Sequence, residues 1–312
     1  PKSGRVLESR AFLDLKELPA NLLILGGGVI GCEFACMAAA LGAKVTVVEM
    51  LEDIVMVLDA DVRRVLRKRM EALGLNLLTG APLTDITADK DKVTGRFKDQ
   101  TLSGDILLVA VGRKPNTADL ELDRAGVKTD TRGAIPVDGQ GRTNIPPVFA
   151  VGDLVSGSVQ LAHAATQQGI AAAEAAAGLR SKVEKLCPSC IFTAPEIGMA
   201  GLTEAQAAAN RIPVKTALFP FAALGKAMAA GETEGFVKWI ADPATGQLLG
   251  AQAVGCHATE LIAEAALAIR NELTVDEVAR TIHSHPTMSE AWMEAAHAFH
   301  GNCIHLPKRP AR

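Results

Sequence analysis

The stretch Gly26-Gly27-Gly28-Val29-Ile30-Gly31 decides the first part of the fold. It follows the apolar run Asn21-Leu22-Leu23-Ile24-Leu25 and precedes a helix-like segment, so the order is strand, glycine turn and helix. Gly26 allows the tight turn, Gly28 leaves room for phosphates, and Gly31 lets the helix pack closely on the strand. The helix N-terminus then offers free N–H groups to an anion, which predicts a dinucleotide site.

The next strand-like segment strengthens this prediction. Residues 44–48 are rich in valine and are followed by Glu49, roughly 20 residues after the glycine turn. A carboxylate in this place accepts a hydrogen bond from a ribose 2′-hydroxyl and repels a 2′-phosphate, and no arginine follows closely to reverse that preference. We therefore expect NAD rather than NADP. The alternative is a glycine turn that only packs a helix on a strand.

Composition excludes several classes of protein. The chain has 312 residues and a net charge of −3, so we expect two or three domains and neither nucleic acid nor an anionic membrane as a partner. The apolar window 22–43 contains the glycine triplet and Glu33, which favours strand, turn and helix over a membrane span. No secretory signal is visible, so a cytoplasmic location is expected.

The six cysteines do not form a disulfide scaffold in a chain of this length. Cys32 and Cys36 are spaced to share one helix face, where packing explains them better than redox chemistry. Cys187 and Cys190 have a thioredoxin-like spacing, but a strand-like segment follows them instead of a helix. Neither pair has the further ligands of a structural zinc site, and we expect no metal.

Alternating segments over residues 21–130 predict a doubly wound α/β domain with an inserted meander. Within it, residues 59–73 read as a helix, 93–97 as part of a hairpin, and 105–110 as a buried strand. Residues 143–153 predict a turn, a very short buried strand over 148–151 and a Gly152-Asp153 ending, and an alanine-rich helix follows over 161–177. Ligands often bind where such a strand end faces a helix N-terminus, although Asp153 could equally cap the helix.

The pattern changes from residue 191. Strand-like runs at 214–219, 235–241 and 248–254 are followed by helix-like runs at 259–270, 275–281 and 289–299, which predicts an α+β domain. Its most reactive segment is His283-Ser284-His285-Pro286-Thr287-Met288-Ser289-Glu290. A loop histidine backed by a glutamate is typical of an oriented general base. By composition alone, an ordinary histidine in a capping loop is the more frequent arrangement.

Together these motifs resemble the pyridine nucleotide-disulfide oxidoreductases, and most of all the branch that oxidises dihydrolipoamide. The motifs that carry the resemblance are Gly26–Glu33, Val48-Glu49, Val109–Asn116, Thr143–Asp153, Leu161–Ala164, Phe192–Glu196, Thr233–Lys238 and His283–Glu290. They occur in the family's order over nearly the whole chain. The resemblance implies an NAD-dependent flavoprotein, in which electrons pass from dihydrolipoyl groups through a disulfide and FAD to NAD.

The resemblance also implies roles for individual residues. The residues implied to bind NAD are Gly26, Gly28, Val29, Ile30, Gly31 and Glu49, with Gly112 near the nicotinamide end. Glu33 would lie beside the nicotinamide and the flavin. The residues implied to bind FAD are Asp153, Leu161, Ala162, His163 and Ala164. His285 would deprotonate a dihydrolipoyl thiol, oriented by Glu290.

The implied domain organisation follows the same family. Residues 1–14 would end a FAD-binding domain, 15–130 would form the Rossmann-like NAD-binding domain, 131–184 would return to the FAD domain, and 185–312 would form the α+β dimerisation domain. The implied partners are a second copy of the chain and the lipoyl-bearing acyltransferase subunit of a 2-oxoacid dehydrogenase complex. The family's FAD-binding glycine motif and its cysteine pair spaced Cys-x4-Cys are absent, so we expect this chain alone to be inactive.

Two alternatives stay open. The chain could belong to a branch that reduces glutathione disulfide or mercuric ion. Glu49 argues against the NADP-dependent members, and the tail 306–312 lacks the paired cysteines of the mercuric branch. It could also be a non-catalytic module that binds a dinucleotide and dimerises.

Overall fold

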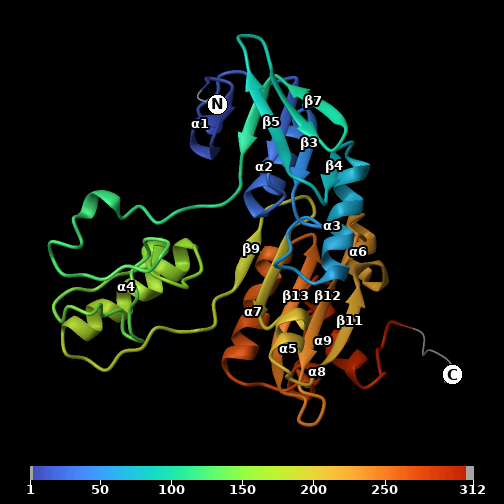
Figure 1. Cartoon of the computed structure of the whole chain (residues 1–312). Coiled ribbons are helices and arrows are strands. Elements are labelled where there is room, and N and C mark those ends of the chain that lie inside the picture. The colour runs from blue at the N-terminus through green and yellow to red at the C-terminus, as the bar shows by residue number, and fades with distance from the viewer. Residues whose placement is uncertain (1–2, 307–312) are drawn as a thin grey trace. The chain divides into compact units, whose positions relative to one another are not determined.

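The computed structural model describes residues 3–306, which form two compact units (Figure 1). Unit 1 combines the residues up to Gly112 with those from Pro188 onward, and unit 2 comprises Arg113–Cys187. Unit 1 contains a parallel sheet with a small meander and an antiparallel sheet, each covered by helices (Figure 1).

The parallel sheet is the Rossmann-like part of unit 1 and has the strand order β1-β8-β2-β3-β4. Its strands are β1 (Val6–Leu7), β2 (Asn21–Leu25), β3 (Lys44–Glu49), β4 (Asn76–Thr79) and β8 (Ile106–Val109). Each neighbouring pair is parallel, with Leu23 of β2 opposite Thr46 of β3 and Leu107 of β8. The central strands are continuous apolar runs because both faces of the sheet are covered.

Helices and a meander complete this part of unit 1. They are α1 (Ser9–Leu13), α2 (Val29–Ala40), α3 (Ala60–Ala72) and the antiparallel strands β5 (Leu83–Ala88), β6 (Val93–Phe97) and β7 (Gln100–Gly104). Asp59 is the N-cap residue of α3 and Leu73 its C-cap, so the predicted helix is confirmed. The buried face of α3 is Val62, Leu66 and Met70, which recur at helical spacing.

The antiparallel sheet has the order β11-β12-β13-β10-β9. Its strands are β9 (Ser189–Ile191), β10 (Ile197–Gly201), β11 (Lys215–Pro220), β12 (Gly235–Ala241) and β13 (Leu248–Gly255). The helical segments around it are α5 (Glu204–Ala209), η3 (Phe221–Ala223), α6 (Gly225–Ala230), α7 (Ala258–Arg270), α8 (Val275–Arg280) and α9 (Glu290–Phe299). The short helices α5 and α6 interrupt the strands and three helices follow the last one, but every neighbouring pair of strands is antiparallel, so the predicted α+β character is confirmed.

Buried tryptophans fix α9 and α7 on this sheet. The rings of Trp239 on β12 and Trp292 on α9 have centroids 4.4 Å apart. The indole N–H of Trp239 donates to the carbonyl of Trp292, and that of Trp292 donates to the carbonyl of Leu261 on α7, each at 3.0 Å. Both polar atoms are thus satisfied inside the core, so the start of α9 and the loop before it have a rigid support.

The two sheets of unit 1 share one core. Cys36 of α2 belongs to the same buried cluster as Ile197 of β10, Phe236 of β12 and Val254 of β13. None of the helices in residues 3–306 has the length and apolar character that crossing a membrane requires.

Unit 2 contains η1 (Ala118–Leu120), η2 (Gly152–Leu154) and α4 (Ala162–Ala176). Its small core includes Val127, Ile135, Ala150 and Val155. The predicted strand over 148–151 is wrong, because Phe149 pairs with Arg142 in an isolated bridge and no ladder extends along it. A strand needs a neighbour along its length, and the described residues of unit 2 do not supply one.

Candidate functional site

The glycine turn between β2 and α2 depends on two close backbone approaches. Gly26 has φ +111°, and a Cβ there would lie 2.5 Å from the carbonyl oxygen of Ala110 at the end of β8. A Cβ on Gly31 would overlap the carbonyl oxygen of Gly26. A Cβ on Gly28, in contrast, would meet nothing within 4 Å. Gly26 and Gly31 therefore hold the turn together, whereas Gly28 borders open space.

The N-terminus of α2 opens onto that space. Gly28 is the N-cap residue and has no side chain to cap the helix. The first intrahelical bond runs from the N–H of Cys32 to the carbonyl of Gly28, so the N–H groups of Val29, Ile30 and Gly31 precede the helical ladder. These groups carry the positive end of the helix dipole and suit a pyrophosphate.

Glu49 lies at the end of β3 beside the same turn. Its Oε2 accepts from the backbone N–H of Gly27 at 2.6 Å, and its Oε1 accepts from that of Leu51 at 2.8 Å. The two bonds fix the carboxylate while each oxygen keeps further acceptor capacity for ribose hydroxyls. Gly27 is the partner that the sequence pattern missed, because it occupies a variable position of the motif, between Gly26 and Gly28.

Gly112 and Glu33 are the two residues implied by the family resemblance to lie near the nicotinamide. Gly112 is exposed, has φ +115°, and comes two residues after Ala110, which contacts the turn. Glu33 lies in the second turn of α2, and its Oε1 accepts from the backbone N–H of Phe192 after β9 at 2.8 Å. Glu33 therefore connects the parallel-sheet part of unit 1 to its antiparallel part, a contact that the sequence did not indicate.

His285, on the loop between α8 and α9, pairs with Glu290, the first residue of α9. His285 Nδ1 lies 2.9 Å from Glu290 Oε1, and the backbone N–H of Thr287 donates to Glu290 Oε2 at 2.8 Å. The Glu290 side chain is 8% exposed and that of His285 is 70% exposed. A carboxylate can only accept, so the Nδ1–H of His285 donates and Nε2 faces outward with its lone pair.

The charge of Glu290 is maintained despite its burial. Burial raises the pKa of this carboxyl, but the Thr287 N–H bond and the His285 imidazole outweigh burial and place it below its ordinary value. An ionised Glu290 both fixes the tautomer of His285 and stabilises the imidazolium that forms when Nε2 takes a proton.

The residues implied to bind FAD all lie within unit 2. Asp153 is exposed within η2, and Leu161 is the N-cap residue of α4 without a side-chain cap bond. Gln168 of α4 accepts from the N–H of Gly152 at 2.6 Å and donates to Ser158 at 2.8 Å. This glutamine fixes the turn before Asp153 against the helix. Ala162 and His163 are exposed, and Ala164 is buried.

Family models match both parts of the chain. Residues 1–169 match the pyridine nucleotide-disulphide oxidoreductase model, and residues 187–296 match the dimerisation domain of the same family. The chain belongs to the pyridine nucleotide-disulphide oxidoreductases. The predicted family and fold class are confirmed.

Individual relatives agree with this assignment. The chain is 43% identical over 310 residues to a dihydrolipoyl dehydrogenase of Chlamydia pneumoniae, covering 99% of this chain and 67% of the relative. It is 40% identical to that of Geobacillus stearothermophilus, covering 97% and 66%. The solved structure of LpdA from Mycobacterium tuberculosis matches with a TM-score of 0.88 at 32% identity, covering 94% of this chain and 65% of that one. The chain thus spans about two thirds of the length of these relatives.

The family uses FAD and a nicotinamide dinucleotide, and the residues present fit both groups to different extents. The open space at Gly28, the uncapped α2 and the fixed Glu49 fit a dinucleotide pyrophosphate and its adjoining ribose. Asp153 and the uncapped start of α4 fit the hydroxyls and polar edge of a flavin, which is a smaller share of such a site.

The cysteines do not show the environment of reactive thiols. Burial raises the pKa of Cys32 and of Cys36, and Cys36 is also near Glu33. Burial likewise raises the pKa of Cys187 and Cys190, and Cys190 lies on strand β9. A raised pKa keeps the unreactive thiol form, so packing is the role that fits these residues.

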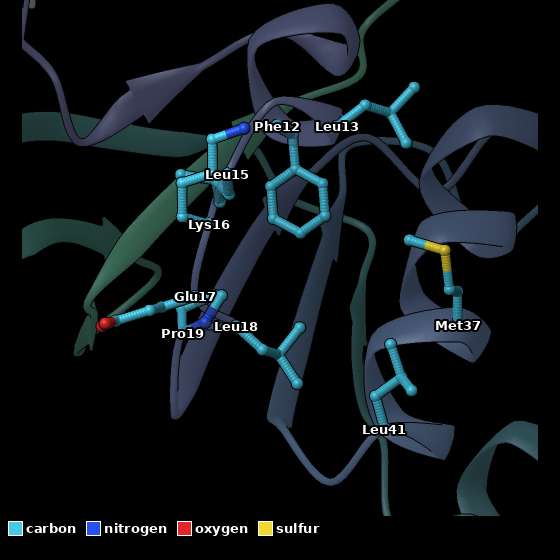
Figure 2. A pocket seen from close by; sticks show the side chains of 9 residues that line it. All are labelled: Phe12, Leu13, Leu15, Lys16, Glu17, Leu18, Pro19, Met37 and Leu41. Atoms are coloured by element: carbon cyan, nitrogen blue, oxygen red, sulfur yellow. The ribbon is translucent and has the colours of Figure 1, made fainter.

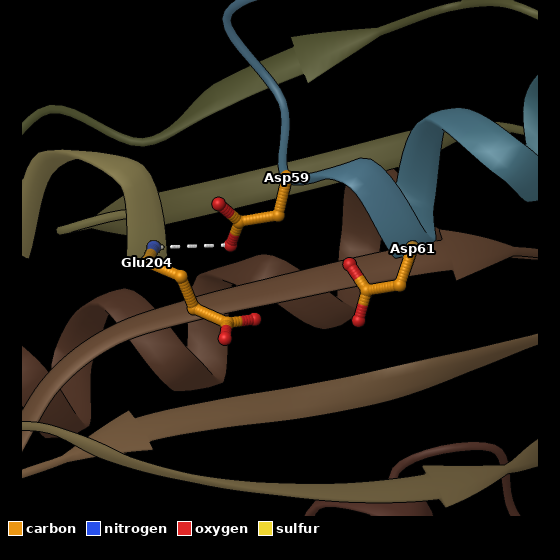
Figure 3. A group of neighbouring side chains, drawn as sticks. All are labelled: Asp59, Asp61 and Glu204. Atoms are coloured by element: carbon orange, nitrogen blue, oxygen red, sulfur yellow. Dashed lines mark hydrogen bonds between the residues drawn. The ribbon is translucent and has the colours of Figure 1, made fainter. Parts of the chain in front are cut away.

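A charge cluster around the buried Lys238 and Asp59 was not predicted from the sequence. Lys238 of β12, 2% exposed, donates to Asp59, Asp61 and Glu204 at distances of 2.7 to 3.1 Å. Figure 3 shows the three carboxylates turned toward one another from the start of α3 and the start of α5. Their oxygens lie close enough to hold a metal ion, but the Lys238 ammonium already serves as their cation.

A shallow groove lies elsewhere in unit 1. It has a volume of about 240 Å³ and is lined by the residues Phe12, Leu13, Leu15, Lys16, Glu17, Leu18, Pro19, Met37 and Leu41 (Figure 2). Met37 and Leu41 are at the C-terminal end of α2, whereas the predicted dinucleotide site is at its N-terminus. At 1.5 Å per residue the two ends of this 12-residue helix lie roughly 18 Å apart, so this groove is not the dinucleotide site.

Proposed function

We propose that this chain is the NAD-binding and dimerisation part of a dihydrolipoyl dehydrogenase. The observation that carries the proposal is the His285–Glu290 pair, a surface imidazole whose Nδ1 is bound 2.9 Å from a buried carboxylate. A module that only binds a dinucleotide and dimerises has no use for an oriented base. The relatives of about 40% identity that bear this enzyme's name support the same choice.

In the proposed reaction His285 acts on the thiol substrate. Its Nε2 accepts the proton of a dihydrolipoyl thiol, and the resulting thiolate is the nucleophile that attacks a disulfide. Glu290 stays ionised and stabilises the imidazolium. A positioned general base of this kind contributes about 10²- to 10⁴-fold to the rate.

The dinucleotide site supplies binding and orientation. The N–H groups of Val29, Ile30 and Gly31 hold the pyrophosphate, and Glu49 holds the ribose. Glu33 and Gly112 border the nicotinamide end. Asp153 and the Leu161–Ala164 turn hold part of the flavin. When bound, FAD and NAD supply the electron transfer that the side chains themselves cannot perform.

Partners and location belong to the same proposal. The dimerisation domain over 187–296 supports a homodimer, and the substrate is the lipoyl group of an acyltransferase subunit of a 2-oxoacid dehydrogenase complex. Cys32, Cys36, Cys190, Cys256 and Cys303 are free thiols, which is typical of a reducing compartment such as the cytoplasm.

A chimera tests this function. The N-terminal third of the Chlamydia pneumoniae relative is joined ahead of this chain, and its flavin absorbance and dimer mass are measured before NAD reduction by dihydrolipoamide. We expect turnover, and we expect His285→Ala to lower kcat/KM about 10³-fold while NADH affinity is unchanged. A chimera that holds flavin and dimerises but does not turn over would refute the enzyme and favour the non-catalytic module.

A further inference from the structure

We propose that His283, held as an imidazolium between Glu264 and the Thr281 carbonyl, is a positioning residue for His285. The proposal rests on the proposed function for the importance of His285, but its geometry stands alone. His283 Nε2 lies 2.7 Å from Glu264 Oε1 on α7, and its Nδ1 lies 3.0 Å from the carbonyl oxygen of Thr281. Its side chain is 5% exposed.

The two partners determine the charge of His283. A carboxylate and a backbone carbonyl are both acceptors at this distance, so both ring nitrogens must donate. A neutral imidazole has a single N–H and would leave one bond unmade, whereas an imidazolium makes both. The Glu264 hydrogen bond raises the pKa of His283, burial opposes it, and the Thr281 carbonyl and the negative charges of Glu264 on α7 and Glu290 on α9 add to the rise.

Within residues 281–286, the His283 side chain makes the hydrogen bond to α7, and the side chains on either side of it are exposed. Ile282 is 96% exposed, and Ser284, His285 and Pro286 are exposed as well. His283 is therefore the anchor of residues 281–286 to α7, just as Glu290 is the anchor of His285 to α9. Two histidine–glutamate pairs, one with a buried histidine and one with an exposed histidine, hold the same short loop from opposite ends.

The sign of the pH dependence follows from the raised pKa. The folded protein holds the His283 proton more tightly than an unfolded chain, where the ordinary value is 6.5. The stabilisation of the loop is therefore fully present below that value and is lost as the pH rises through the raised pKa. Above it, His283 loses one of its two bonds and His285 loses its fixed position.

Nuclear magnetic resonance of the isotope-labelled chain tests the proposal without turnover. At neutral pH we expect both His283 ring nitrogens to be protonated. We expect His283→Gln to speed exchange of the His285 Nδ1–H with water about tenfold, as expected when one charge-assisted contact is lost. The matched control is His300→Gln, which removes another histidine–carboxylate pair, 2.8 Å to Asp276, and should leave this exchange unchanged.

A second variant protects the test against a folding defect. Glu264→Gln keeps the shape of the partner and should lower the titration midpoint of His283 by about one pH unit. In the active chimera it should also move the alkaline fall of kcat/KM to lower pH. A singly protonated His283 at neutral pH, or an unchanged His285 exchange rate in His283→Gln, overturns the proposal. An inactive chimera with the expected resonances overturns only the proposed function.

Discussion

The glycine turn packs α2 closely on β2, and the Lys238 cluster joins the start of α3 to β12. The two regions differ in how far apart their residues lie in the sequence. The turn from Gly26 to Glu49 occupies two dozen residues of continuous chain. The cluster joins Asp59 and Asp61 to Glu204 and Lys238, so its members come from three distant segments. A local site can be predicted from its pattern, whereas a distributed one becomes visible only after folding.

The two regions also use charge in opposite ways. The turn leaves backbone N–H groups open to an anion from outside. The cluster satisfies its anions internally, with Lys238, the amide of Gln252 and the backbone N–H of Glu204 all donating to Asp59. Because α3 carries Asp59 and β12 carries Lys238, these bonds tie the parallel-sheet part of unit 1 to the antiparallel part. In the proposed function the glycine turn binds a ligand, whereas the cluster holds the two parts of unit 1 together.

The largest effect should come from breaking the cluster. Burial lowers the pKa of Lys238, but Asp61, Glu204 and Asp59 outweigh burial and raise it, so the ammonium stays charged. Lys238→Met leaves the buried Asp59 carboxylate without its cation and should lower the free energy of unfolding by about 3 kcal/mol. Urea unfolding measures this, with Lys226→Met at an exposed position as the control. A change of similar size in both variants would mean that the cluster does not hold the two parts together.

The next effect concerns the packing of the turn itself. A Cβ on Gly31 would overlap the Gly26 carbonyl, so Gly31→Ala must push α2 away from β2. We expect a loss of about 2 kcal/mol in unfolding free energy together with the loss of NADH binding. Thermal unfolding and NADH fluorescence titration measure the two quantities. Full stability in Gly31→Ala would show that the turn can relax without cost.

These two predictions mark what the sequence can and cannot specify. The helix ending near Leu73 and the strand β12 over Gly235–Ala241 follow from local periodicity and end signals, and they were predicted within one residue. The strand expected over 148–151 was wrong because pairing depends on a neighbour that local pattern does not reveal. The predicted domain boundaries and ligand residues stay predictions.

The role of His283 lay outside the reach of the sequence for the same reason. Glu264 lies on α7, 19 residues before His283, which is in the loop after α8. Only the fold brings the two side chains to 2.7 Å from each other. Glu290, five residues after His285 on the adjoining helix, could be predicted because its spacing is local.

A smaller effect should separate binding from packing within the glycine turn. A Cβ on Gly28 has no protein neighbour within 4 Å, so Gly28→Ala should leave the unfolding free energy nearly unchanged. In the proposed function the same Cβ stands where the pyrophosphate approaches the helix, and we expect NADH affinity to fall about thirtyfold, or roughly 2 kcal/mol. Gly42→Ala is a poor control because φ at Gly42 is +100°, which strains an alanine. The control for NADH affinity is Ala40→Gly, at the exposed C-terminal end of α2. Undiminished NADH affinity would place the phosphates elsewhere.

The smallest effect should appear as a change of preference. In Glu49→Gln the amide can still accept from one of the two backbone N–H groups, Gly27 or Leu51, while its NH₂ replaces the second acceptor. The ribose 2′-hydroxyl loses an ionised acceptor and a 2′-phosphate loses a repelling charge. NADH should bind about tenfold more weakly than to the unsubstituted protein, a change of roughly 1.4 kcal/mol. NADPH should bind at least as tightly as it does to the unsubstituted protein. The ratio of the two dissociation constants is the informative quantity, because a general distortion of the turn would weaken both dinucleotides equally. An unchanged ratio would mean that Glu49 only braces the turn, and its carboxylate would then belong with Asp59 among the groups that hold the fold rather than bind the ligand.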